Sequence, residues 1–226
     1  ALAGLERAPG SRLRLVLSGH GSQDGMLTNV DFTTRTARGL VTDGRLRPEG
    51  LIDALGAARQ VWCVFVYDRE ILAPLPRADR RLEFIHASVA DLNRQLQRLG
   101  ASHGQTQVRL IVRDGLAWQE IPRLARALDV QAVYYNHDDD PGALSRDSQV
   151  RDALDDAGVA THSFKDHVIF ERSEVLSATG TPYAVFTPYK NAWLKKLEPC
   201  FLKAHPVQAD AAHLAPVTPE MAPPPP

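Results

Sequence analysis

The chain has 226 residues, with 26 lysines and arginines against 27 aspartates and glutamates. This near-neutral balance gives no global attraction to nucleic acid or to an anionic membrane surface. A hydrophobic content of 44% is enough for one domain core. No apolar run approaches the roughly 18 residues that a membrane-spanning helix needs, so we expect no membrane partner.

The two cysteines, Cys63 and Cys200, lie far apart in the sequence. Their separation matches neither a zinc site nor a CxxC redox motif. Cys63 stands inside an apolar run, which is typical of a buried free thiol in a reducing compartment. The sequence therefore predicts a cytoplasmic protein.

Both ends of the chain differ from its middle. Residues 1–38 contain Gly/Ser and Thr clusters with little periodicity, and they are predicted to form an irregular extension. The apolar stretch at 13–19 is too short for a signal peptide. Residues 199–226 end in a run of prolines and are predicted to form a proline-rich tail, because proline cannot continue a helix.

Between these ends, strand patterns alternate with helix patterns. Continuous apolar runs of β-forming residues predict buried strands, and apolar residues at helical spacing predict amphipathic helices, the first ended by Gly100. The predicted strands cover 61–67, 108–112, 131–136 and 159–164, and the predicted helices cover 79–99, 117–128 and 144–157. A further strand is predicted near 39–41, with a helix over 50–58.

This alternation predicts an α/β fold, a Rossmann-like parallel five-stranded sheet with helices on both faces. In such sheets ligands collect at the carboxyl ends of the strands. The strand at 131–136 ends there in Asn136, followed by His137 and three consecutive aspartates. Tyr67 and Asp68 end a neighbouring predicted strand and should line the same crevice.

The acidic loop at 138–140 admits several interpretations. Three aspartates are ligands that Ca²⁺ or Mg²⁺ accepts, but the loop lacks the alternating oxygens and final glutamate of an EF-hand, so we predict no metal site. His137 has the chemistry of a general base, yet no nucleophile stands nearby. A polar turn at the crevice rim is the favoured interpretation. Arg146 and Asp147 either cap the following helix or bind the strand-end loop.

Four segments, taken in order, resemble the DNA photolyase/cryptochrome family. They are VWCVFVYDREIL, RRLEFIHASVADLNRQLQRLG, IPRLARALDVQAVYYNHDDDPGALSRDSQV and GTPYAVFTPYKNAWLKKL, and they cover about residues 60 to 198. Each match is weak alone, but their order and spacing are specific. Neither GxGxxG after a strand nor GxxxxGK[ST] occurs, so the two commonest phosphate-binding loops are absent from the sequence.

The resemblance implies an α/β domain over 39–186 that binds a light-harvesting antenna chromophore, a folate, deazaflavin or flavin. It implies that 187–198 is an exit segment toward a helical FAD domain, which this chain is expected to lack. The family's repair of pyrimidine dimers in damaged DNA would then require that domain, and no catalytic residue is expected here. The crevice residues expected to hold the antenna are Tyr67, Asp68, Asn136, His137, Asp140 and Arg146.

The chain also departs from the family pattern. The family's opening strand has a Trp-Phe-Arg centre that is missing from 39–55. Gly142 and Ala143 stand where folate-binding members carry an Asn-Glu pair, and neither side chain can hydrogen-bond a pterin. Two alternatives therefore stay open, a non-catalytic cryptochrome-like module and an adenine-nucleotide-binding α/β protein. Without its partner domain, the apolar exit segment is expected to cause self-association.

Overall fold

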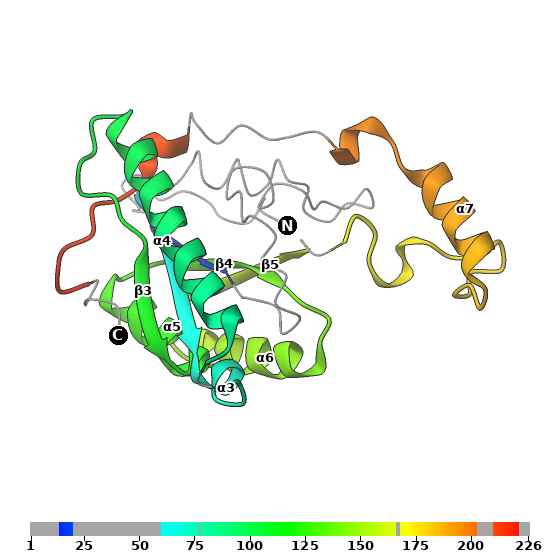
Figure 1. The fold of residues 1–226 in the computed structure, drawn as a ribbon, viewed down its shortest axis with the longest axis horizontal. Coiled ribbons are helices and arrows are strands. Elements are labelled where there is room, and N and C mark those ends of the chain that lie inside the picture. Colours follow the sequence, from blue (N-terminus) through cyan, green and yellow to red (C-terminus); the bar gives the residue numbers. More distant parts are fainter. Residues whose placement is uncertain (1–13, 20–59, 77, 166–167, 203–209, 222–226) are drawn as a thin grey trace.

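The structure, a computed structural model, describes residues 14–19, 60–76, 78–165, 168–202 and 210–221 (Figure 1). Within these ranges five strands form one sheet in the order β3-β2-β1-β4-β5, and all neighbouring strands are parallel. The strands are β1 (Arg14–Gly19), β2 (Gln60–Asp68), β3 (Ile111–Gly115), β4 (Ala132–His137) and β5 (Ala160–Lys165). The predicted α/β class with a parallel sheet is confirmed.

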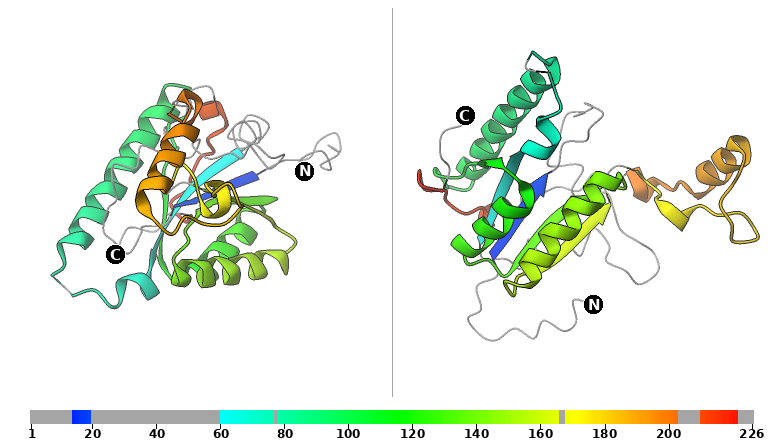
Figure 2. Two further views of the ribbon diagram at one scale, coloured as in Figure 1. Left: turned by 90° about the vertical axis from the view of Figure 1, so that its right-hand side faces the viewer. Right: turned by 90° about the horizontal axis from the view of Figure 1, so that it is seen from below.

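Helices cover both faces of this sheet. Helix α4 lies on one face, and α5 and α6 lie on the other (Figure 2). The α-helices are α3 (Arg69–Leu72), α4 (Arg80–Ala101), α5 (Ala117–Ala127), α6 (Pro141–Asp155) and α7 (Phe186–Lys196). Three short 3-10 helices follow β5, namely η2 (Arg172–Glu174), η3 (Pro199–Leu202) and η4 (Asp210–His213).

The alternation of side chains along each strand divides the core into two clusters. On β2, Val61, Cys63 and Tyr67 pack toward α4. Trp62, Val64 and Val66 of the same strand pack toward α5, together with part of α6. Burial raises the pKa of the free Cys63 thiol to about 12, so the thiol stays protonated and unreactive. Its side chain packs in the core as a small apolar group.

Strand β1 corrects the prediction for the first part of the chain. It lies inside the predicted irregular extension, yet it pairs with β2 on one side and β4 on the other. The apolar run that is too short for a signal peptide has the ordinary length of a buried strand. The predicted strand near 39–41, the predicted helix over 50–58 and the rest of 1–38 lie outside the described residues.

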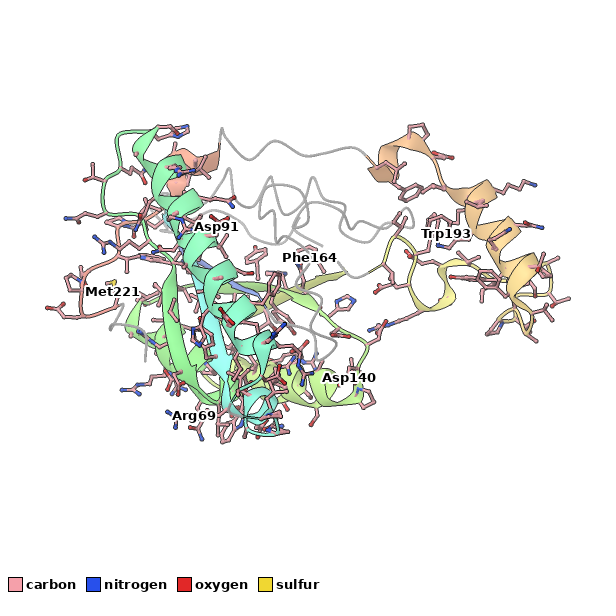
Figure 3. The ribbon with its side chains drawn as sticks, viewed as in Figure 1. Arg69, Asp91, Asp140, Phe164, Trp193 and Met221 are labelled. Atoms are coloured by element: carbon pink, nitrogen blue, oxygen red, sulfur yellow. The ribbon has the colours of Figure 1, made fainter. Side chains whose placement is uncertain are left out.

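The return segment, residues 210–221, corrects the prediction of a proline-rich tail. Its Ala215 N–H donates to the Val61 carbonyl (2.8 Å), and the Trp62 indole donates to the Pro216 carbonyl (3.2 Å). Leu214 forms a parallel β-bridge with Val61. Figure 3 shows Met221 of this segment on the opposite side of the molecule from Trp193. Pro216 is tolerated because it follows η4 in a stretch of the segment that is not helical.

Several element boundaries differ from the predicted ones. Strand β3 begins at Ile111 and not at 108, because the Leu110 N–H donates to the Asn93 side chain (2.9 Å). Helix α4 continues past Gly100, where an added Cβ would lie 2.6 Å from the Val108 Cβ. Gly100 therefore permits close packing and does not end the helix. Helix α6 begins at Pro141 and not at 144.

Residues 168–202, which we call the arm, leave the sheet after β5. Figures 1 and 2 show α7 well away from the sheet, so the predicted exit segment is the helix of a projecting arm. The arm has a small core of its own. The buried Phe170 ring lies edge-on to the Trp193 ring (centroids 5.5 Å apart) and to the Phe201 ring (4.9 Å).

Among the residues that the structure describes, no helix combines the length and the apolar character needed to cross a bilayer.

Candidate functional site

The six predicted site residues lie at or next to one edge of the sheet, but on two different faces. Strand alternation places Tyr67 and Asn136 on the face that α4 covers, where Asn136 is in register with Phe164. It places Asp68 and His137 on the face that α5 and α6 cover. Asp140 and Arg146 belong to the start of α6, on that second face. The residues therefore do not converge on one ligand.

Two groups of aromatic rings flank the end of β1 on the α4 face. On one side the Tyr67 ring packs against the His86 ring, with centroids 4.7 Å apart, and against the Phe65 ring at 5.1 Å. On the other side the Tyr134 ring packs against the His162 ring at 4.6 Å and is stacked with Phe164 at 6.1 Å. We call these rings the aromatic edge: Phe65, Tyr67, His86, Tyr134, His162 and Phe164.

Strand β1 separates the two groups and ends at Gly19, which has no side chain and is in register with Phe65. Strands β2 and β3 extend from β1 in one direction, and β4 and β5 extend in the other. The boundary between β1 and β4 is therefore the topological switch point of the sheet, where ligands of doubly wound folds bind. Because β2 and β4 are two strand spacings apart, about 10 Å separates the flanking backbones.

The aromatic edge favours neutral rings. Burial raises the pKa of Tyr67 and of Tyr134, and it lowers the pKa of His162. Each shift disfavours the charged form of the side chain. This surface is therefore suited to stacking on a flat ligand.

The lowered pKa of His162 predicts a pH-dependent stability. The unfolded chain binds a proton at His162 more readily than the folded chain does, so the free energy of unfolding should fall as the pH drops through the ordinary histidine pKa of about 6.5. We expect His162→Phe to flatten this dependence in urea titrations between pH 7.5 and pH 5. Parallel pH profiles for the variant and the parent chain would contradict the assignment.

Asp68 is buried and joins the starts of two helices. Its Oδ1 accepts the Glu70 N–H of α3 (3.0 Å), and its Oδ2 accepts the Ala117 N–H of α5 (3.3 Å). Helix α5 begins after Leu116, whose side chain makes no cap hydrogen bond, so Asp68 replaces the missing cap from a neighbouring strand. Both carboxylate oxygens therefore have structural partners.

The three aspartates after β4 also have partners within the protein. Asp138 accepts the Asp140 N–H (3.0 Å), and Asp140 accepts the Gly142 and Ala143 N–H groups as the N-cap of α6. Asp139 pairs with Arg172 at 2.9 Å. Over the described ranges, no three acidic, histidine or cysteine residues gather as metal ligands would. The acidic loop caps a helix and forms the rim of this sheet edge.

Arg146 and Asp147 lie on the inward face of α6, and both are buried. The Arg146 Nε lies 3.8 Å from Asp147 Oδ1, and it has no hydrogen-bond partner among the residues described. Asp147 also faces Tyr135, whose pKa is raised first by burial and then by the Asp147 charge. The prediction that Asp147 caps the helix is wrong, because Asp140 occupies that position.

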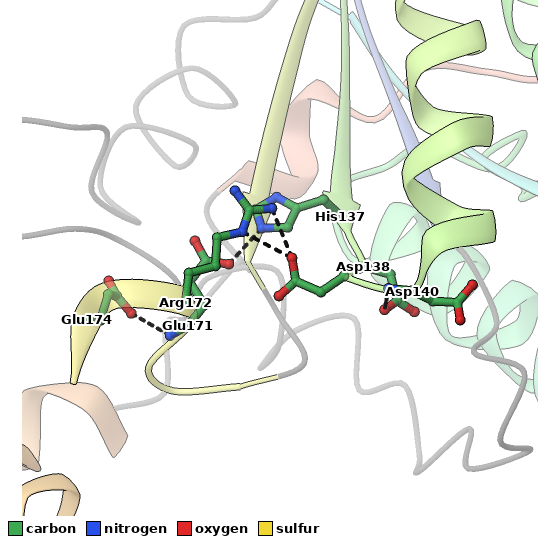
Figure 4. Close-up of polar contacts among 7 residues, drawn as sticks. His137, Asp138, Asp140, Glu171, Arg172 and Glu174 are labelled. Carbon is green, nitrogen blue, oxygen red and sulfur yellow. Dashed lines mark hydrogen bonds and ion pairs between the residues drawn. The ribbon is translucent and has the colours of Figure 1, made fainter. Parts of the chain in front are cut away.

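The His137 imidazole contacts a residue that the sequence did not identify. Its Nε2 lies 2.8 Å from Glu171 Oε2, and both side chains are largely buried (Figure 4). Arg172, the next residue, donates to Asp139 through Nε (3.0 Å) and Nη2 (2.9 Å). These partners lie more than 30 residues away along the chain, and no sequence pattern in 168–185 marks them.

Comparison with known proteins gives the same family as the quoted motifs. The family model described as DNA photolyase matches residues 42–212. The deoxyribodipyrimidine photo-lyase of a Synechococcus species is 30% identical over 150 residues, which are 66% of this chain and 30% of that protein. A deoxyribodipyrimidine photo-lyase of Halobacterium salinarum is 38% identical over 133 residues, 59% of this chain and 26% of that protein.

A solved structure has the same fold. The bacterial class III photolyase of Agrobacterium tumefaciens superposes with a TM-score of 0.63 at 19% identity, over 91% of this chain and 36% of that one. At this identity the likeness establishes the fold alone. The chain spans about a third or less of the length of the two curated relatives and somewhat more than a third of the solved photolyase.

Proposed function

The chain belongs to the DNA photolyase family, and we propose that its α/β unit binds a planar light-harvesting chromophore at the aromatic edge. The observation that carries the proposal is the arrangement around Gly19, a strand end without a side chain at the switch point, flanked by aromatic groups on both sides. Flat aromatic ligands gain binding energy from such offset and edge-on ring contacts.

Different roles are proposed for the six predicted residues. Tyr67 and Asn136 belong to the ligand side, where strand alternation places both residues beside the rings. Asp68, Asp140 and His137 act as positioning residues, because their polar atoms bind backbone or Glu171. Arg146 is also proposed as a positioning residue, because it is buried on the α6 face with its Nε 3.8 Å from Asp147 Oδ1.

The chromophore class is proposed from what the first turn of α6 lacks. Gly142 and Ala143 offer no side-chain hydrogen bonds, so the proposal favours a flavin or deazaflavin over a folate. The free buried thiol of Cys63 supports a reducing compartment such as the cytoplasm. The family relatives are longer than the part that these 226 residues match. We propose that light-driven repair of damaged DNA and binding of a catalytic FAD belong to the part of the relatives that this chain does not span.

Ligand titration of the purified 226-residue chain tests this proposal. FMN, an 8-hydroxy-deazaflavin and methenyltetrahydrofolate are added separately, and binding is followed by ligand absorption and equilibrium dialysis. We expect one equivalent of the flavin or deazaflavin to bind. His86→Ala should weaken that binding by up to about tenfold, the value of one aromatic contact, while Gln119→Ala on the exposed surface of α5 should change nothing.

Other outcomes would contradict parts of the proposal. Tight binding of the folate alone would overturn the chromophore class, and tight binding of ADP alone would favour the nucleotide-binding alternative. No binding of any of these compounds would overturn the proposal for the aromatic edge. One equivalent of FAD together with repair of a thymine dimer under blue light would show that these residues suffice for the whole reaction.

A further inference from the structure

Two polar side-chain contacts join the end of β4 and the loop after it to the base of the arm. His137 contacts Glu171, and Asp139 pairs with Arg172 (Figure 4). We call these four residues the latch. The strand-end residues are two positions apart, and their partners are adjacent, so the two contacts together fix both the position and the rotation of the arm base. A single exposed ion pair would fix neither, because such a pair is worth little.

The environment of the two contacts differs. The His137 and Glu171 side chains are 17% and 16% exposed, whereas those of Arg172 and Asp139 are 57% and 53% exposed. Arg172 has a positive φ of 47°, a left-handed conformation that a residue with a side chain adopts only at a cost. In this conformation the Arg172 guanidinium donates two hydrogen bonds to Asp139.

The latch connects to α7 through a continuous set of contacts. The Glu171 N–H donates to Glu174 Oε2 (2.7 Å) in a capping box that closes η2. The Glu174 carbonyl accepts a hydrogen bond from the Lys196 ammonium of α7. Lys196 also lies over the Phe170 ring, 5.0 Å from its centroid, and Phe170 packs against Trp193. These contacts therefore join the arm base to α7 without a break.

From this geometry we infer that the latch sets the orientation of the arm relative to the sheet. Asn136 of the ligand side directly precedes His137, so the latch also fixes the arm relative to the aromatic edge. Any molecule that binds α7 would be held at a defined distance and angle from that edge. The inference concerns the free chain and holds whether or not the aromatic edge binds a chromophore.

Distance measurements between two spin labels test this inference. Labels are placed at Asp152→Cys on α6 and Asn191→Cys on α7, both exposed positions, in a Cys200→Ser background. Cys63 stays unlabelled because it is buried. Pulsed electron paramagnetic resonance on the ligand-free chain should give one narrow distance distribution for the parent latch.

Charge reversal separates the latch from ordinary surface effects. Asp139→Arg and Arg172→Asp should each broaden the distribution or add a second population, and the double swap should restore the narrow one. Glu171→Gln, which keeps the shape of the side chain, should also broaden the distribution. It serves as the test if either charge reversal fails to fold. Asp114→Arg breaks the Arg69–Asp114 pair (2.5 Å), which is remote from the arm, and should have no effect.

Two results would overturn the inference. One is an unchanged distribution in folded Asp139→Arg, Arg172→Asp and Glu171→Gln chains. The other is a double swap that remains as broad as the single reversals, because the arm would then respond to something other than pairing. Neither result bears on chromophore binding, so failure here and failure of the proposed function can be told apart.

Discussion

Replacing Asp68 with alanine is expected to lower the free energy of unfolding by about 2–4 kcal/mol. The change removes the acceptors of two backbone N–H groups on two helices, and the lost cap of α3 alone costs about 1 kcal/mol. Ala117 is almost fully buried, so its N–H would be left unsatisfied, which adds about 1–3 kcal/mol. Urea denaturation followed by circular dichroism measures this loss.

Asp140→Ala is the matched control, since it also removes an aspartate N-cap. Asp140 is exposed and caps only α6, and water can replace its carboxylate, so we expect a loss of about 1 kcal/mol. Asp68→Asn keeps one carbonyl acceptor and should fall between the two. If Asp68→Ala costs no more than Asp140→Ala, the shared cap does not stabilise the junction between β2, α3 and α5.

The regular elements of the sheet could be predicted because each carries its own periodicity. β2 is a continuous run of β-forming residues, and α4 repeats its apolar residues every three or four positions. β1 is not predicted because its only apolar run, the three residues 15–17, carries little signal by itself. Its strand character depends on β2 and β4, which pair with it from distant parts of the chain.

The candidate site was only partly predictable for a related reason. The sequence located the carboxyl edge, since acidic and amide residues follow β4 directly. It did not separate the faces, because the face that each side chain takes depends on the strand register. Helix caps such as Asp68 with Ala117 and latch pairs such as His137 with Glu171 join residues 34 or more positions apart. No local pattern encodes such pairs.

Self-association of the chain through the arm is the second large effect that we expect. Val185, Phe186 and Leu194 are 62%, 72% and 53% exposed, and Leu202 is also exposed at 53%. Exposed apolar groups gathered on one projecting element mark an interaction surface. Helix α7 of the arm stands away from the sheet (Figure 1). We propose that two chains associate through these arms.

The structure changes the choice of substitutions for this experiment. Trp193 and Leu197 are obvious candidates from the sequence, but both are half-buried, and Trp193 packs against Phe170. Replacing either would disturb the arm itself. Phe186→Ser and Leu194→Ser remove exposed side chains and leave that packing in place. Each should weaken dimerisation by about 10- to 100-fold, because burying one large apolar side chain is worth about 1.5–3 kcal/mol.

Gel filtration with light scattering over a range of concentrations measures the dimerisation constant. Phe84→Ser on α4 is the matched control, because Phe84 is 47% exposed but does not belong to the arm. If Phe84→Ser weakens association as much as Phe186→Ser does, the surface lies elsewhere. A chain that stays monomeric at the highest concentration would show that four exposed apolar residues on one arm are too few to hold two copies together.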